Sequence, residues 1–192
     1  QGTDDNLCLQ SSSLPVNDVH ISNCSFSSVC AAIRIGLKSI GSISDVHISH
    51  CSMKNVWREG IKIECSEGGN ISDINIQDIT MNDVSRPIFI LLNNRFEPDD
   101  LGSSLELDHI PEIGTMSDII ISDIIASDSD EMRNTHYRFD DDVMGSPKFA
   151  GIRIDAEKNH PIRNLTLRNI SYKFIGGVKL SDIPNEYPEV ID

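Results

Sequence analysis

A short pattern of aliphatic residues returns along the first half of this chain at a nearly constant interval. The first form of the pattern repeats after 27 and then 28 residues, as Val19-x-Ile21-x-x-Cys24-x-Phe26, Val46-x-Ile48-x-x-Cys51-x-Met53 and Ile74-x-Ile76-x-x-Ile79-x-Met81. A second, offset form keeps the same interval, as Leu7-x-Leu9, Ile33-x-Ile35, Ile61-x-Ile63 and Ile88-x-Ile90. Alternation of apolar and polar residues is typical of a strand, and two strand patterns that share one period indicate a repeat architecture.

Both patterns resume later in the chain, but with two longer gaps between them. The first form returns at Ile119-x-Ile121 and Leu165-x-Leu167, and the second at Ile152-x-Ile154. Two loop insertions of about 18 residues, around 94–114 and 128–148, account for the gaps. No helix of convincing length is indicated. We therefore predict an all-β fold, a right-handed parallel β-helix (solenoid) with about five coils of ~27 residues each.

The 192 residues and their charge limit the classes of protein to consider. We expect one domain over residues 1–192, and the start inside a repeat suggests a fragment truncated at its N-terminus and at its C-terminus. The net charge of −14 argues against nucleic acid as a partner. No stretch approaches the ~20 apolar residues of a membrane helix, so no membrane partner is expected. We expect a monomer.

The cysteines and histidines do not show the spacing of a metal site. The five cysteines include no C-x-x-C pair. Cys24 and Cys51 share a position in adjacent repeats, where two small buried apolar groups are expected; a disulfide or a metal site is the alternative. His20 and His47 share an outward position, which favours a polar ladder. The sequence therefore predicts no metal and no cofactor.

Ionisable residues gather at equivalent positions of the second strand pattern. Equivalent residues in stacked parallel strands lie ~4.8 Å apart, so these side chains should form one charged face. Its members are Asp4, Asp5, Arg34, Arg58, Glu59, Lys62 and Glu64. Two carboxyl groups in different environments can separate into a protonated acid and an ionised base, which is what hydrolysis of a glycosidic bond requires.

Several segments resemble glycoside hydrolase family 28, the polygalacturonases. Residues 2–11 (GTDDNLCLQS) are similar to its Asp-Asp motif, and residues 31–36, 59–63, 68–71, 160–167 and 186–189 to later segments. The resemblance covers about the C-terminal half of a family member. It implies inverting hydrolysis of α-glycosidic bonds in pectic polysaccharides or oligosaccharides, with Asp4 as general acid and Asp5 as one of two carboxylates that activate water. The second such Asp is expected upstream. A secreted or periplasmic location is expected by analogy.

Two departures from the family pattern affect the expected substrate. The family's Gly-His-Gly falls on Cys30-Ala31-Ala32, and its Arg-Ile-Lys falls on Lys62-Ile63-Glu64. By resemblance, Arg34, Arg58, Lys62 and Glu64 are expected to bind substrate. Because Glu64 would repel a galacturonate carboxylate, a neutral sugar is expected there. The alternatives are a catalytically inactive carbohydrate-binding β-helix, and a polysaccharide lyase or epimerase that uses Arg34 or Lys62 as its base.

Overall fold

A computed structural model describes residues 2–95, 110–128 and 151–173 of the chain. These residues form strands and their connections, and they include no helix. Accordingly, no helix in this part of the chain is long and apolar enough to cross a membrane. Most of the two predicted insertions falls outside the described residues.

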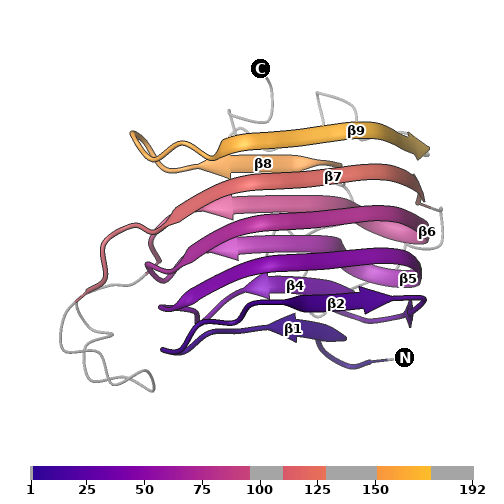
Figure 1. Cartoon of the computed structure of the whole chain (residues 1–192). Helices are drawn as coiled ribbons and strands as arrows, with labels where there is room; N and C mark the ends of the chain where they lie inside the picture. Colours follow the sequence, from indigo (N-terminus) through magenta and orange to yellow (C-terminus); the bar gives the residue numbers. More distant parts are fainter. Residues whose placement is uncertain (1, 96–109, 129–150, 174–192) are drawn as a thin grey trace, which may run out of the picture.

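The strands form one open sheet of nine members with parallel pairing (Figure 1). Their bounds are β1 Leu7–Leu9, β2 Val19–Ser22, β3 Ser25–Phe26, β4 Ile33–Gly36, β5 Ser42–Cys65, β6 Asn70–Leu92, β7 Thr115–Ser127, β8 Arg153–Ala156 and β9 Arg163–Lys173. The main order is β1-β4-β5-β6-β7-β9; in addition, β2 and β3 pair with β5, and β8 pairs with β6. The predictions of an all-β class and of parallel pairing are confirmed.

The predicted register of both patterns is confirmed. Val19 pairs with Val46, Val46 with Ile74, and Ile74 with Ile119. In the second pattern, Leu7 pairs with Ile33, Ile33 with Ile61, and Ile61 with Ile88. A slip of one residue would turn every aliphatic side chain to the opposite face of its strand, so the alternating pattern specifies this register strongly.

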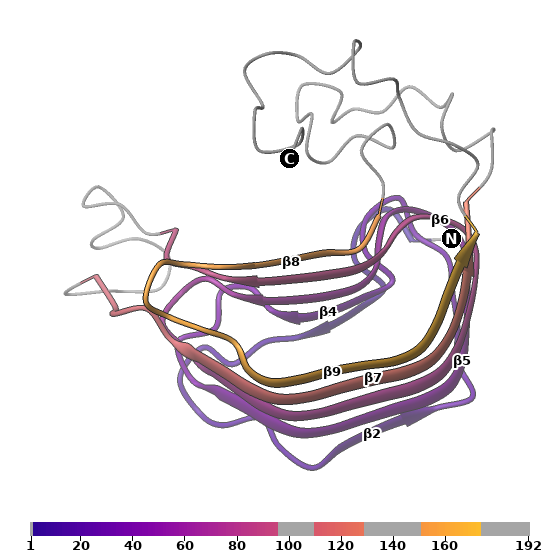
Figure 2. The same cartoon turned by 90° about the horizontal axis from the view of Figure 1, so that it is seen from above.

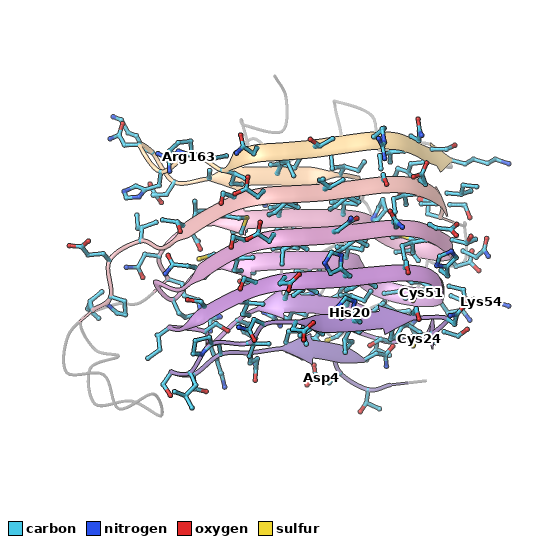
Figure 3. The ribbon with its side chains drawn as sticks, viewed as in Figure 1. Asp4, His20, Cys24, Cys51, Lys54 and Arg163 are labelled. Atoms are coloured by element: carbon cyan, nitrogen blue, oxygen red, sulfur yellow. The ribbon has the colours of Figure 1, made fainter. Side chains whose placement is uncertain are left out.

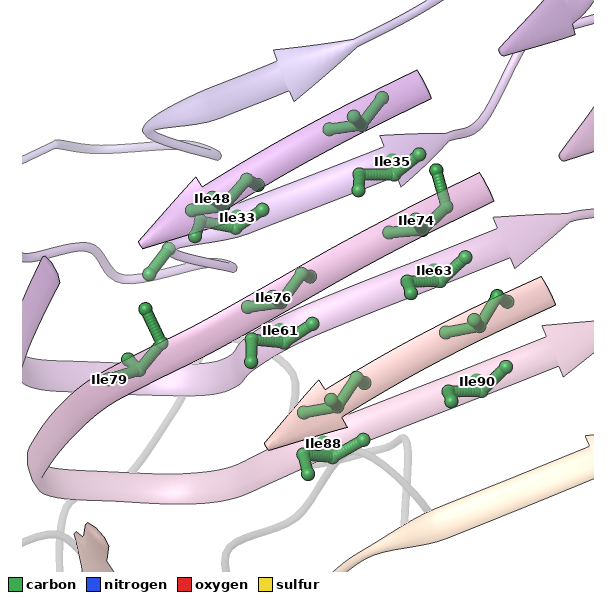
Figure 4. Close-up of a cluster of buried hydrophobic side chains, with 14 of the residues drawn as sticks. Ile33, Ile35, Ile48, Ile61, Ile63, Ile74, Ile76, Ile79, Ile88 and Ile90 are labelled. Carbon is green, nitrogen blue, oxygen red and sulfur yellow. The ribbon is translucent and has the colours of Figure 1, made fainter. Parts of the chain in front are cut away.

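Seen from above, the strands lie in two rows that face each other (Figure 2). The first row holds β2 and the beginnings of β5, β6, β7 and β9; the second holds β1, β4, β8 and the ends of β5 and β6. The short strand β3 pairs with β5 at Ser52 and Met53, beyond the bend at His50. Isoleucines from the two rows point toward one another (Figure 4). Ile33, Ile61 and Ile88 of the second row and Ile48 and Ile76 of the first are all fully buried. Burying such side chains stabilises the fold by about 1.5–3 kcal/mol each.

The bends in the long strands occur at residues with left-handed backbone conformation. Asn23, His50 and Asp78, which share one position of the repeat, have φ of 56°, 53° and 56°. The strand β5 continues through His50 and β6 through Asp78, so the bend there is a single residue inside a strand, whereas Asn23 lies between β2 and β3. A further position of the repeat, represented by Asp45 and Asp73, has φ of 54° and 55° and was not predicted. Asn and Asp adopt this conformation at the lowest cost among residues with a side chain.

Candidate functional site

The two adjacent carboxylates lie just before β1 and differ in their surroundings. Asp4 is exposed, and one of its oxygens accepts a hydrogen bond of 2.8 Å from the backbone N–H of Asp5. The Asp5 carboxylate is half-buried; it accepts a hydrogen bond of 2.9 Å from the Ala31 N–H and one of 3.0 Å from Nη1 of Arg34. Figure 3 shows Asp4 beneath β1, at the edge of the sheet. One carboxylate is therefore fixed and the other is accessible.

Arg34 connects Asp5 to the next strand of the second row. Its Nη2 donates to Oε2 of Glu64 at 2.7 Å, and Nζ of Lys62 lies 3.2 Å from the same oxygen. Burial opposes ionisation of Glu64, but the charges of Lys62 and Arg34 outweigh it and hold the pKa of Glu64 below its ordinary value. Burial also opposes the charge of Arg34, while Asp5 and Glu64 raise its pKa overall. The four groups thus form one chain of alternating charge.

A second set of charged side chains lies next to this network, on β5 and β6 of the same row. Glu59 lies 3.6 Å from Nε of Arg58 and 3.5 Å from Nη1 of Arg86. The ring of Phe89 is approached by three cations, with centroid distances of 5.1 Å to Lys62, 5.3 Å to Arg86 and 5.7 Å to Arg153. Cations over an aromatic face are attracted by its quadrupole. Sequence reasoning did not give Phe89 and Arg153 a role, although the column that contains Arg34 and Lys62 passes through both.

Three of the seven residues of the predicted charged face are buried, three are half-buried, and Asp4 is exposed. The exposed fractions of Glu59, Lys62 and Glu64 are 2%, 7% and 7%. Lys62 and Glu64 alternate along β5 with the inward Ile61 and Ile63, so they point away from the isoleucine core, and they are buried against their ion-pair partners. Pairing permits this burial, because an isolated buried charge would cost several kcal/mol. Among the predicted site residues, Asp4 is the one that is exposed.

The structure brings together most of the residues predicted for the site. Asp5, Arg34, Glu64 and Lys62 form one contiguous network. Arg58 contacts Glu59 instead and belongs to the second set of charges.

Close approach of β4 and β5 supports the network. Gly36 has φ of 104°, and a Cβ placed there would lie 1.8 Å from the carbonyl oxygen of Glu64. Only glycine fits at this position, because an L side chain would meet both backbone strain and this clash.

A thiol that sequence reasoning did not assign to the site lies beside the two carboxylates. Ligand atoms of Asp4, Asp5 and Cys30 all lie within 4.8 Å of one another. Burial raises the pKa of the Cys30 thiol, and the charges of Asp5 and Asp4 raise it further. The signal was present in the alignment of repeats, because Cys30 occupies the position equivalent to Asp4.

The first row carries a polar ladder on its outer side, as predicted. The rings of His20 and His47 stack at 5.0 Å with an interplanar angle of 12°. Asp18 and Asp45 lie 3.1 Å and 3.0 Å from these two rings. A depression of about 610 Å³ lies beside the ladder, and neither Asp4 nor Asp5 lines it. Its lining is Asp45, His47, Asp73, Ile74, Asn75, Asp118, Ile120, Asn164 and Thr166.

Cys24 lies between β2 and β3, Cys51 lies in β5, and both are free thiols (Figure 3). Cys51 is buried and Cys24 is half-buried, so the prediction of small buried groups holds fully for Cys51 and partly for Cys24.

A smaller depression adjoins the Asp4–Asp5 segment. It has a volume of about 370 Å³ and is lined by Gly2, Asn6, Ser25, Phe26, Ser27 and Lys54. An accessible carboxylate next to a recess with amide, hydroxyl and ammonium groups can contact a hydroxylated ligand.

The chain matches no protein-family model, and it shows no significant similarity to a curated protein or to a solved structure.

Proposed function

We propose that the chain is a right-handed parallel β-helix of about five coils, each built from one strand of the first row and one of the second. The constant register offsets of 26 to 28 residues among residues 7–92 support this arrangement. So does the bending of β5 and β6, each of which runs through both rows. In this fold the carboxylate pair and the charged face belong to one side of the solenoid.

We propose that the protein is a glycoside hydrolase that acts on pectic polysaccharides or oligosaccharides, similar to family 28. The observation that carries this proposal is the asymmetry of the two carboxylates. Asp4 is open to solvent and can meet a glycosidic oxygen, whereas Asp5 is held by Arg34 and by the Ala31 N–H. Glycoside hydrolysis needs one carboxyl group that gives a proton and one that stays ionised.

The distance between the two carboxylates refines their roles. Their ligand oxygens approach within 4.8 Å, whereas an inverting enzyme separates its acid and its base by about 6.5–9.5 Å to leave room for water. Asp4 is therefore proposed as the general acid, and Asp5 as a carboxylate that helps to hold the attacking water. An inverting reaction then requires a further carboxylate on the other side of that water.

The substrate proposed for this site has a neutral sugar next to the cations. Arg34 already contacts Asp5 and Glu64, and Lys62 contacts Glu64 at 3.2 Å. A uronate carboxylate would have to displace Glu64 or lie beside it. Two like charges ~4 Å apart repel by about 4 kcal/mol at an effective dielectric constant near 20. Rhamnose or another neutral unit avoids this cost.

The test is release of reducing ends by the natural protein that contains this chain. Wild type is compared with Asp4→Asn on polygalacturonate, rhamnogalacturonan and short pectic oligosaccharides, and Asp18→Asn, an exposed aspartate of the first row, is the matched control. We expect the Asp4 variant to lose activity by 10²-fold or more, in the range typical for removal of a general acid. The control should keep its activity. Equal activity of both variants, or a preference for plain polygalacturonate, would contradict the proposal.

A carbohydrate-binding protein without catalysis is the second candidate, favoured by one observation. Ala31 occupies the position of the histidine in the family's Gly-His-Gly, so the histidine beside the acid is absent. Oligosaccharide binding without hydrolysis of any substrate in the panel would support this candidate.

A lyase or epimerase is less well supported. Arg34 and Lys62, the bases that it would use, are both paired with carboxylates. An unsaturated product that absorbs in the ultraviolet would be its signature.

A further inference from the structure

Three potential metal ligands of different chemistry converge at the N-terminal edge of the second row. They are the carboxylates of Asp4 and Asp5 and the thiol of Cys30, and their ligand atoms lie within 4.8 Å of one another. Asp4 and Asp5 precede β1, while Cys30 precedes β4, so the pairing of these strands brings the donors together. In a four-coordinate zinc site, ligand atoms lie 2.0–2.3 Å from the metal. Ligand atoms that share such a metal lie no more than about 4 Å apart, so binding would draw these three side chains closer together.

A buried serine holds the two segments in place. The Ser28 hydroxyl donates a hydrogen bond to the carbonyl oxygen of Asp4 and accepts one of 2.9 Å from the N–H of Cys30. Ser28 is fully buried. Asp5 is oriented separately, by the Ala31 N–H and by Arg34. The backbone that carries the three donors is therefore fixed before a metal arrives, which lowers the cost of binding.

The set of donors selects the type of metal. Ca²⁺ and Mg²⁺ prefer sites made of oxygen ligands alone, whereas a thiolate favours Zn²⁺ among the common divalent ions. Cys30 is only 7% exposed, whereas Asp4 is exposed. A metal bound here would therefore have the thiolate on its buried side and a coordination position accessible to solvent on the other. Three protein ligands and one open coordination position are typical of catalytic zinc sites.

The charges around the three donors are compatible with a bound cation. Arg34 lies 3.0 Å from Asp5 but is also paired with Glu64, and Arg58 is paired with Glu59. These two guanidinium groups therefore already have carboxylate partners, and the two carboxylates and the thiolate together would offset the charge of Zn²⁺. Because binding must displace the thiol proton, the affinity should rise with pH.

We propose that Asp4, Asp5 and Cys30 form a binding site for one Zn²⁺ ion. One consequence of zinc binding rests on the proposed glycoside hydrolase function. Zn²⁺ bound to Asp4 would occupy the carboxylate that serves as general acid. Zinc would then act as an inhibitor of the enzyme. Binding itself does not depend on any catalytic activity and can be measured without substrate.

The experiment uses the natural protein, reduced and freed of metal. Zn²⁺ binding is measured by calorimetry, and Co²⁺ is added separately, because coordination by a thiolate gives it a sulfur-to-metal charge-transfer band in the near ultraviolet. The variants are Cys30→Ser and Asp4→Asn. Their matched controls are Cys24→Ser, which changes another thiol next to a strand, and Asp18→Asn.

We expect one Zn²⁺ per chain, with the Co²⁺ band present in the wild type and in both controls. Cys30→Ser should abolish the band and weaken Zn²⁺ binding at least tenfold, and Asp4→Asn should weaken binding while keeping the band. Circular dichroism of each variant shows that it is folded. No Zn²⁺ binding by the wild type, or unchanged binding in Cys30→Ser, would overturn the proposal. Failure of hydrolysis alone would leave the metal site standing.

Discussion

The Asp5–Arg34–Glu64 chain of charges gives a quantitative prediction for Arg34→Ala. Removal of one partner from a buried ion pair costs about 3–5 kcal/mol when the remaining charge has no other partner. Both carboxylates keep other contacts: Glu64 remains 3.2 Å from Lys62 and accepts a hydrogen bond of 3.4 Å from the Ser66 hydroxyl, and Asp5 keeps its hydrogen bond from the Ala31 N–H. The side chain of Arg34 is 14% exposed, so solvent screens the site only slightly. We therefore expect a loss of about 2–3 kcal/mol in the free energy of unfolding.

Urea denaturation measures this loss, and thermal unfolding should show a decrease in Tm of about 4–12 °C. Arg168→Ala, at an exposed arginine of β9, is the matched control and should change stability by less than about 0.5 kcal/mol. A double-mutant cycle with Glu64→Gln isolates the contact of 2.7 Å between the two side chains. We expect a coupling energy of about 1–2 kcal/mol. Additive effects of the two changes, or a loss below about 0.5 kcal/mol for Arg34→Ala, would refute this account.

Two further predictions concern acid and the core. Because the folded pKa of Glu64 lies below the ordinary 4.5, the unfolded chain takes up its proton first as the pH falls. Stability contributed by Glu64 should therefore be complete above pH 4.5 and decrease below it; Glu64→Gln should flatten this part of the urea-stability profile, and an unchanged slope would count against the ion pairs. Ile63→Ala, at a fully buried position, should cost about 2–5 kcal/mol. Ile125→Ala, at a position that is 65% exposed, should cost less than about 1 kcal/mol in the same assay, and similar losses for both would contradict the assigned core.

The strand pairing was predictable because it follows from a local rule repeated many times. Ile33, Ile61 and Ile88 must share one column if all of them are to be buried, and a slip of one residue would expose them together. The column of Arg34 and Lys62 followed from the same alignment. The alternating pattern could not show that the bend at His50 is a single left-handed residue within β5, because that conformation is a property of one residue.

The candidate site was predictable in its members but not in its contacts. Asp4, Asp5, Arg34, Lys62 and Glu64 were assigned to one face by register alone. Register fixes the distance between neighbouring backbones at ~4.8 Å, but a long charged side chain can reach several different partners from the same backbone position. The packed structure therefore determines that Arg34 pairs with both Asp5 and Glu64. It also determines that Arg58 contacts Glu59.

By itself, then, the amino-acid sequence determined the class of fold, the parallel register and the residues of the charged face, since these follow from a hydrophobic period that the chain repeats. The tertiary structure alone decided that Glu59, Lys62 and Glu64 are buried among their counter-ions, and that Cys30 meets Asp4 and Asp5. Burial and side-chain convergence are collective results of packing between segments 26–30 residues apart. No local pattern encodes them, because each depends on the positions of all the neighbouring side chains at once.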